Sequence, residues 1–170
     1  MHLERALAGL ACVAVLSSPR AVAAEIGPAD TWFVMPGPTV GLSRNDTEGL
    51  ILGGELSLVH LDHGTWMGGY VDMARDFGLG AMRVSLGAEA GFSLVGLDAG
   101  ALLEYADDHY TPGIRLRVLA GGGWMTLYVG PLLRFGSKDS LTAGAHRVSL
   151  EAGFLFKLPF DLSKGRPVWP

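Results

Sequence analysis

The sequence has little cysteine, little lysine and no long apolar run. Its single cysteine is Cys12, and lysine occurs only at Lys138, Lys157 and Lys164. No stretch reaches the roughly 20 apolar residues that a transmembrane helix needs. Mean hydropathy is nevertheless positive, at +0.31. The hydrophobic residues are therefore spread over many short segments.

A basic surface is also missing. The 170 residues include 13 basic and 17 acidic side chains, for a net charge of −4. Proteins that bind nucleic acid normally carry a basic patch or stripe. We therefore expect no nucleic-acid partner, and the length fits one domain.

Residues 1–24 have the order of features typical of a secretory signal peptide. Arg5 is followed by an apolar run over 6–16 and then by small residues before Glu25. We predict removal of 1–24 by cleavage near Ala24. Cys12 could alternatively mark a lipoprotein, but Gly9, at the third position before it, is not the large aliphatic residue expected there. The predicted mature chain has no thiol, which excludes disulfides and thiol chemistry.

Alternation of apolar and polar residues dominates the rest of the chain. It is clearest over 147–160, where Val148, Leu150, Ala152, Phe154 and Phe156 share one face. Side chains of a β-strand point alternately to its two faces, so this period of two indicates strands. The pattern predicts eight strands, over residues 32–42, 50–61, 66–74, 82–94, 95–105, 114–121, 124–135 and 147–160.

The connections between these strands are predicted to alternate in length. Segments 43–49, 75–81, 106–113 and 136–146 are polar and longer, whereas 62–65, 94–95 and 121–123 are short. An up-and-down barrel with both termini on one side has this alternation. Proline removes a backbone donor. Pro36, Pro38 and Pro131 therefore predict irregular first and seventh strands.

Two kinds of barrel fit this period: a membrane barrel with its apolar face outward, or a soluble lipocalin-like barrel that holds an apolar ligand inside. Glycine on the polar face, scarce lysine and balanced strand charges favour the membrane barrel. Six acids against six bases suit a closed polar interior, because a buried unpaired charge is costly. The predicted charge network of the lumen comprises Glu55, Asp72, Arg83, Glu89, Asp98, Glu104, Arg115, Arg117, Arg134, Arg147, Glu151 and Lys157.

The signal peptide, the eight strands and the charged interior resemble the small outer-membrane barrels related to the OmpA transmembrane domain and OmpX. The resemblance implies an all-β, eight-stranded antiparallel up-and-down transmembrane β-barrel over 25–160, followed by a tail over 161–170. It also implies a monomer in the outer membrane of a Gram-negative bacterium, with membrane lipid and the barrel-assembly machinery as partners. We expect no cofactor, no bound metal and a structural or surface-interaction role.

Three groups of residues are candidates for chemical sites. His146, Ser149 and Glu151 could form the Ser–His–acid set of a lipid A-modifying hydrolase. Their positions in the predicted strand, however, place Ser149 and Glu151 on one face and His146 on the opposite face, so the nucleophile and its base would not meet. His60, Asp62 and His63 could bind zinc across a short turn. Residues 107–109 could bind a cation weakly. The polarity of solvated turns explains the last two groups more simply.

Overall fold

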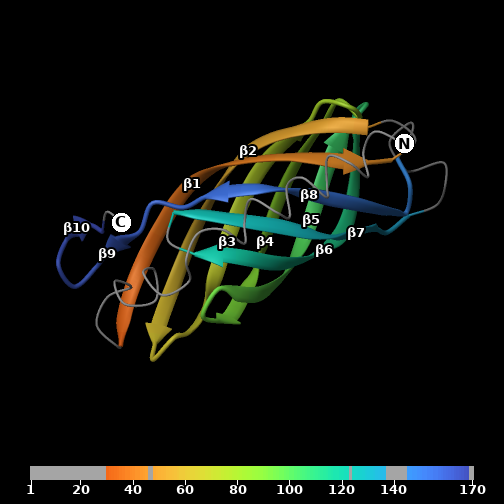
Figure 1. Ribbon diagram of the computed structural model, residues 1–170. Coiled ribbons are helices and arrows are strands. Elements are labelled where there is room, and N and C mark those ends of the chain that lie inside the picture. Colours follow the sequence, from red (N-terminus) through yellow and green to blue (C-terminus); the bar gives the residue numbers. More distant parts are fainter. Residues whose placement is uncertain (1–29, 46–47, 123, 137–144, 169–170) are drawn as a thin grey trace.

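A computed structural model describes residues 30–45, 48–122, 124–136 and 145–168. Consecutive strands among the first eight pair antiparallel, and the first strand also pairs with the eighth, which closes the barrel (Figure 1). Two short strands follow, and the described residues contain no helix. The strands are β1 Thr31–Arg44, β2 Glu48–Asp62, β3 Thr65–Asp76, β4 Ala81–Phe92, β5 Val95–Ala106, β6 His109–Gly122, β7 Met125–Arg134, β8 Val148–Phe156, β9 Phe160–Asp161 and β10 Arg166–Pro167.

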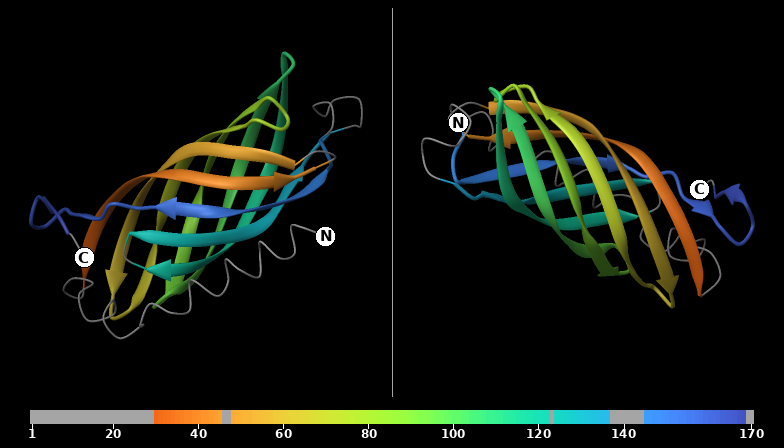
Figure 2. Two further views of the ribbon diagram at one scale, coloured as in Figure 1. Left: turned by 45° about the horizontal axis from the view of Figure 1, so that its top comes forward. Right: turned by 180° about the vertical axis from the view of Figure 1, so that it is seen from behind.

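The prediction of an eight-stranded antiparallel up-and-down barrel is confirmed. The strands slant around a common axis (Figure 2), and their side chains alternate between exposed and buried. The apolar side chains of the alternating pattern face outward: Leu86 is 67% exposed and Val148 is 60% exposed. The charged side chains face inward. The barrel therefore has an apolar outer surface and a polar, charged interior.

The three short connections and the long last connection are confirmed, but the other three connections predicted to be long are short. One end of the barrel, here called the turn end, has two-residue connections at 63–64, 93–94 and 123–124. The other, here called the loop end, has connections at 45–47, 77–80, 107–108 and 135–147, so only the last is long. The third was predicted as 106–113, but β6 begins at His109. Asp107 and Asp108 have φ of 49° and 62°, as a two-residue type I′ hairpin requires.

The prolines lie in regular strands, at places where ladder pairing is interrupted. β1 pairs with β8 over residues 39–44 and with β9 at 33–34, so Pro36 and Pro38 lie between the two ladders. Pro131 lies in β7, where pairing with β6 skips residues 130–131. A proline has no N–H to donate, so a gap in the ladder accommodates it. At the same gap a Cβ on Gly37 would overlap the Phe156 carbonyl group.

The last predicted strand, 147–160, is two strands. β8 ends at Phe156, the chain passes through residues 157–159, and β9 resumes pairing with β1. β10 then pairs with β9 as a small hairpin. The predicted boundary between barrel and tail, after Phe160, therefore falls inside β9.

Candidate functional site

The barrel interior brings together eleven of the twelve residues predicted to form the charge network. Each of the eleven is buried, with at most 6% of its surface exposed. Arg147 is the exception: it precedes β8 and is exposed at the loop end. Asp76, predicted to lie in a loop, is instead the last residue of β3 and is fully buried. The predicted balance of six acids and six bases is therefore wrong: the eleven buried residues and Asp76 together comprise seven acids and five bases.

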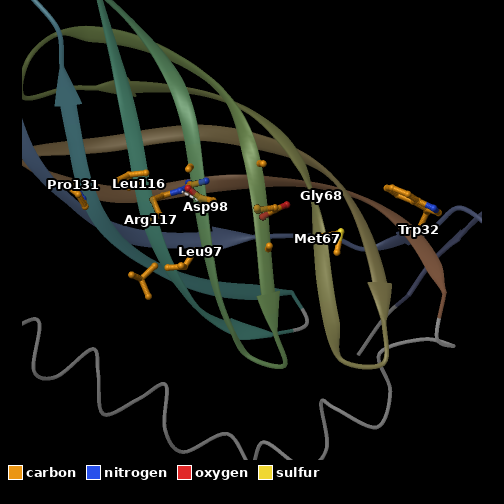
Figure 3. Close-up of a pocket in the computed structure, with 13 residues that line it drawn as sticks. Trp32, Met67, Gly68, Leu97, Asp98, Leu116, Arg117 and Pro131 are labelled. Atoms are coloured by element: carbon orange, nitrogen blue, oxygen red, sulfur yellow. Dashed lines mark hydrogen bonds and ion pairs between the residues drawn. The ribbon is translucent and has the colours of Figure 1, made fainter.

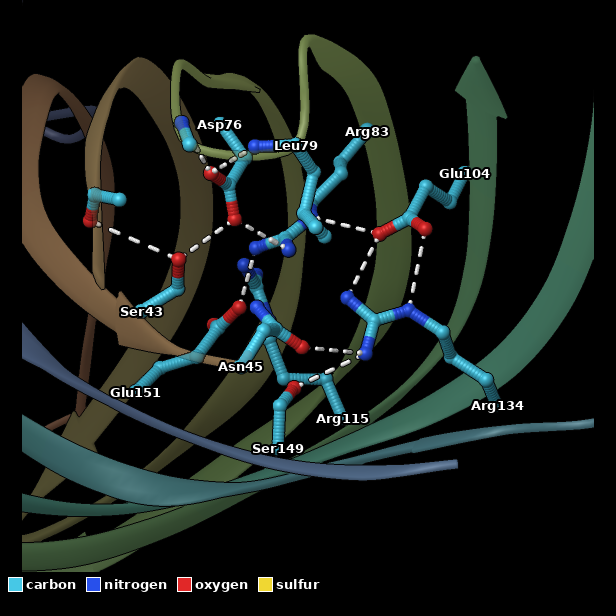
Figure 4. A network of polar contacts seen from close by, with 12 residues as sticks. Ser43, Asn45, Asp76, Leu79, Arg83, Glu104, Arg115, Arg134, Ser149 and Glu151 are labelled. Atoms are coloured by element: carbon cyan, nitrogen blue, oxygen red, sulfur yellow. Dashed lines mark hydrogen bonds and ion pairs between the residues drawn. The ribbon is translucent and has the colours of Figure 1, made fainter. Parts of the chain in front are cut away.

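The loop-end cluster consists of Asp76, Arg83, Glu104, Arg134 and Glu151 (Figure 4). Arg83 contacts three carboxylates: Asp76 at 2.6 Å, Glu104 at 2.9 Å, and Glu151. Arg134 binds Glu104 with two nitrogens, at 2.8 and 3.0 Å. These side chains come from β3, β4, β5, β7 and β8, so the cluster ties five strands together across the interior. Such charge-assisted bonds are stronger than neutral ones.

Asp76 also fixes the connection above the cluster. Its Oδ1 accepts hydrogen bonds from the backbone N–H groups of Gly78 and Leu79, at 2.9 and 3.2 Å. Its Oδ2 accepts a hydrogen bond of 2.6 Å from the Ser43 hydroxyl. Asp76 thus links the interior charges to the 77–80 connection, which explains its burial at the end of a strand.

The turn-end cluster consists of Glu55, Glu89, Asp98, Arg117 and Lys157. Arg117 lies 2.6 Å from Glu55 and 2.7 Å from Asp98. Lys157 lies 2.8 Å from Glu55 and 2.7 Å from Glu89. Glu55 therefore bridges the two cations, and the cluster joins β2, β4, β5 and β6 to the segment after β8.

Among the described residues, one ion pair lies between the two clusters. Arg115 Nη1 donates to Asp72 Oδ1 at 2.8 Å. Ser85 donates a further hydrogen bond of 3.3 Å to the same carboxylate, and Thr39 donates one of 3.5 Å. Charged side chains thus occupy successive levels of the interior from the loop end toward the turn end.

Pairs of glycines make room for the interior aromatic rings. Gly87 and Gly100 lie opposite each other in β4 and β5, and a Cβ on Gly87 would come within 2.8 Å of the Tyr70 ring. Gly91 and Gly96 border Trp66 in the same way, and Gly41 and Gly153 border Tyr128. The Arg117 guanidinium lies 5.1 Å from the centroid of the Tyr70 ring and 5.2 Å from that of Tyr128. Cation–π attraction adds to its ion pairs.

The turn end of the interior is apolar. Leu119, Tyr128 and Leu155 form a buried cluster, with Trp66 packed against it. Phe33, Val59 and Leu61 are also buried at this end. The charged levels are thus separated from the turn end by a hydrophobic layer.

The three residues considered as a hydrolase catalytic set make other contacts. Ser149 accepts a hydrogen bond of 3.0 Å from Arg134, and Glu151 pairs with Arg83. His146 is exposed outside β8, and its carbonyl oxygen accepts a bond from Arg134. The structure therefore does not align these three side chains as nucleophile, base and acid.

The residues considered as cation ligands lie at two hairpin connections. His60 and Asp62 belong to β2, and His60 is partly buried, whereas Asp62, His63 and residues 107–109 are exposed. His60 pairs with Asp30 at 2.9 Å, and His63 pairs with Asp62. His109 contacts the Asp107 carbonyl oxygen, and Asp108 accepts a hydrogen bond of 2.8 Å from Tyr105. Within the described ranges, no group of three or more acidic, histidine or cysteine side chains has the arrangement of a metal site.

A pocket lies on the outer face of β3 to β7, and Trp32 of β1 also belongs to its lining (Figure 3). Met67, Leu97 and Leu116 of its lining are exposed on that face, and Ala88, Ala90 and Ala99 also line it. The charged residues of the lining have their side chains in the ion pairs of the interior. The pocket therefore lacks the convergent polar groups that orient a small-molecule ligand.

The β9–β10 hairpin has its own polar centre in Asp161. The Ser163 hydroxyl donates to Asp161 Oδ1 at 2.6 Å, and the backbone N–H groups of Ser163 and Lys164 donate at 2.8 and 3.1 Å. These hydrogen bonds, that of the Ser163 hydroxyl foremost, hold the pKa of Asp161 below its usual range. The carboxylate thus fixes the turn that returns the chain along β9.

Comparison with known proteins gives no family assignment: no family model matches the sequence, and no curated protein matches it. Among the residues described, no helix is long and apolar enough to cross a membrane.

Proposed function

We propose that this chain is a small integral outer-membrane β-barrel protein with a filled, charged interior and a structural or surface-interaction role. In this proposal it resembles the OmpA and OmpX type of barrel, resides in a Gram-negative outer membrane, and loses residues 1–24 on export. The loop end faces the outside of the cell and the turn end faces the periplasm. The observation that carries the proposal is the inverted distribution of side chains, with apolar residues outside and charges inside.

The apolar outer surface supports contact with lipid. Large exposed apolar side chains occur on all eight strands, including Leu42, Leu58, Met73, Leu86, Leu97, Leu116, Val129 and Leu150. A soluble monomer rarely exposes a contiguous apolar patch larger than a few hundred Å². In a bilayer the same surface would contact acyl chains, and the outer pocket would be covered with the rest.

The buried ion pairs favour this proposal over a barrel that binds an apolar ligand inside. A ligand cavity of that kind is lined mainly by hydrophobic and aromatic side chains. Here ion pairs such as Arg83–Glu104 and Arg117–Asp98 cross the interior. The interior therefore stabilises the barrel by cross-linking its strands, and interaction with partners is left to the loop end.

The proposal is tested by arginine substitutions at two depths. Leu86 lies near the middle of β4, and Val148 is the first residue of β8, at the loop end. Leu86→Arg should lower the free energy of folding into lipid by about 2–4 kcal/mol, and Val148→Arg by about 0–1 kcal/mol, because the penalty falls toward the membrane interface. Urea titrations in phosphatidylcholine vesicles measure both.

The two positions are matched in exposure, so a water-facing surface predicts a different result. An exposed leucine in water tolerates arginine to within about 0.5 kcal/mol. Equal and negligible effects of Leu86→Arg and Val148→Arg would therefore contradict the membrane proposal.

A further inference from the structure

β8 is too short to cover the whole of β1. The β1–β8 ladder comprises residues 39–44 of β1, so residues 31–38 have no partner in β8, which ends at Phe156. The backbone N–H and C=O groups along an unpaired strand edge need other hydrogen-bond partners, and no water is available for them inside a bilayer. In the membrane location proposed above, this stretch of β1 therefore requires a cover.

The β9–β10 hairpin supplies that cover. β9 pairs with residues 33–34 of β1. Two backbone hydrogen bonds flank this short ladder: the Leu158 N–H donates to the Pro36 carbonyl oxygen at 2.9 Å, and the Leu162 N–H donates to the Trp32 carbonyl oxygen at 3.0 Å. β9 and β10 lie beyond the end of β8 (Figures 1 and 2). Because the segment is bonded to β1 at both ends, the orientation of its two faces is fixed.

The outer face of this segment is apolar. Leu158, Phe160 and Leu162 are exposed, whereas their neighbours Lys157 and Asp161 are buried. Side chains of an extended chain point alternately to its two faces. The alternation of the barrel wall thus continues past the end of β8, and the outer apolar surface of the barrel extends onto the hairpin.

Trp32 marks the level at which this apolar surface ends. Trp32 and Leu42 both face outward on β1 and are ten positions apart. Ten residues of a strand tilted by about 40° rise about 26 Å along the membrane normal, close to the apolar band of about 25 Å in outer-membrane barrels. Trp32 also contacts the His60 ring, with centroids 4.9 Å apart, and His60 pairs with Asp30. A tryptophan beside polar groups is typical of the membrane interface.

The hairpin therefore lies at the periplasmic edge of the apolar band. Leu162 is bonded to Trp32 and so lies at the interface, and Phe160, opposite Val34 in the ladder, lies slightly deeper. Lys164 is exposed in the turn that follows, at the level of the lipid headgroups. β10 is the free edge of the sheet, but it has two residues and one of them is proline, features that blunt a strand edge.

We propose that the outer face of the β9–β10 hairpin, formed by Leu158, Phe160 and Leu162, contacts phospholipid of the periplasmic leaflet. The hairpin thereby completes the lipid-facing wall where β8 has ended and closes the edge of β1. This inference rests on the membrane location proposed above. It makes the segment after Phe156 a part of the membrane-facing barrel and not a tail in the periplasm.

A fluorophore on the hairpin tests this contact. In a Cys12→Ser background, which removes the one native cysteine, a single cysteine is introduced by Phe160→Cys, Leu86→Cys or Asp107→Cys and labelled with bimane. Each labelled protein is placed in phosphatidylcholine nanodiscs, whose two faces are both open to solvent. Lipids brominated along the acyl chain quench a fluorophore that contacts lipid, and iodide quenches one that contacts water.

We expect the Phe160→Cys label to be quenched by brominated lipid and protected from iodide, like the Leu86→Cys label in β4. The Asp107→Cys label, in a loop-end connection, should show the reverse. Iodide quenching of the Phe160→Cys label alone would overturn the inference and leave the membrane location intact, whereas iodide quenching of the Leu86→Cys label as well would contradict both. Protection of the Phe160→Cys label from both quenchers would indicate contact with protein and would also overturn the inference.

Leu162→Cys keeps the test decisive if Phe160→Cys does not fold. Leu162 is 54% exposed and Phe160 is 39% exposed, so replacing Leu162 removes less packing. Because Leu162 lies at the interface, its label should be quenched by brominated lipid more strongly than the Asp107→Cys label. Equally weak quenching of these two labels by brominated lipid would overturn the inference.

Discussion

At the scale of single residues, Glu104 is the carboxylate on which the loop-end cluster most depends. It accepts bonds from Arg83 and from two nitrogens of Arg134, and it is the one carboxylate paired with Arg134 among the described residues. Removing one partner of a buried ion pair leaves an uncompensated charge, which typically costs about 3–5 kcal/mol. Among the described residues, Arg134 would then retain only neutral acceptors, which are Asn45 Oδ1, the His146 carbonyl oxygen and the Ser149 hydroxyl.

We therefore expect Glu104→Gln to lower the free energy of unfolding by about 3–5 kcal/mol. The urea midpoint of the refolded barrel measures this loss. Asp107→Asn, in the exposed connection just after β5, is the control and should stay within about 0.5 kcal/mol of wild type. A Glu104→Gln barrel as stable as the control would show that the loop-end ion pairs do not stabilise the fold.

The period of two predicts which face most residues occupy, and this is why eleven of the twelve predicted interior charges lie in the interior. The two differences, Arg147 and Asp76, both lie at strand ends. At a strand end, the alternating pattern predicts the face to which a side chain would point. It does not predict whether the strand extends to that residue. The hydrogen bonds from Ser43, Gly78 and Leu79 that hold Asp76 inside depend on the packing of the 77–80 connection, which no local pattern encodes.

At the scale of strands, the paired glycines are the feature that sequence alone did not predict. Glycine on the polar face was predicted to relieve crowding, but the pairing of Gly87 with Gly100 depends on the register between β4 and β5. Each pair makes room for an aromatic ring from a strand nearby in the barrel. The register is set by the closed ladder, so the partner of each glycine follows only from the fold.

Gly100→Val should lower the free energy of unfolding by about 1–3 kcal/mol, because its branched side chain would overlap Tyr70 in a filled interior. Gly69→Val is the matched control: Gly69 faces outward, and a Cβ there meets only the Gly87 carbonyl oxygen at 3.4 Å. Urea midpoints of both variants measure the difference. Equal stabilities would contradict the assignment of Gly100 to the space beside Tyr70.

At the scale of the whole molecule, the filled interior predicts a closed barrel. Eight strands enclose a space that side chains can just fill, whereas open aqueous channels occur in much wider barrels. Here ion pairs cross the interior at successive levels, and an apolar layer follows at the turn end. Purified protein in planar bilayers should therefore give no steady ion current. Stable single-channel currents would mean that the charges line a pore instead.

Cell fractionation shows whether the apolar outer surface contacts lipid. We expect the protein to sediment with outer membranes, to stay there after carbonate washing, and to migrate differently on a gel before and after boiling, because the closed barrel resists detergent until heated. Recovery in the soluble periplasmic fraction without detergent, with the same mobility before and after boiling, would contradict it.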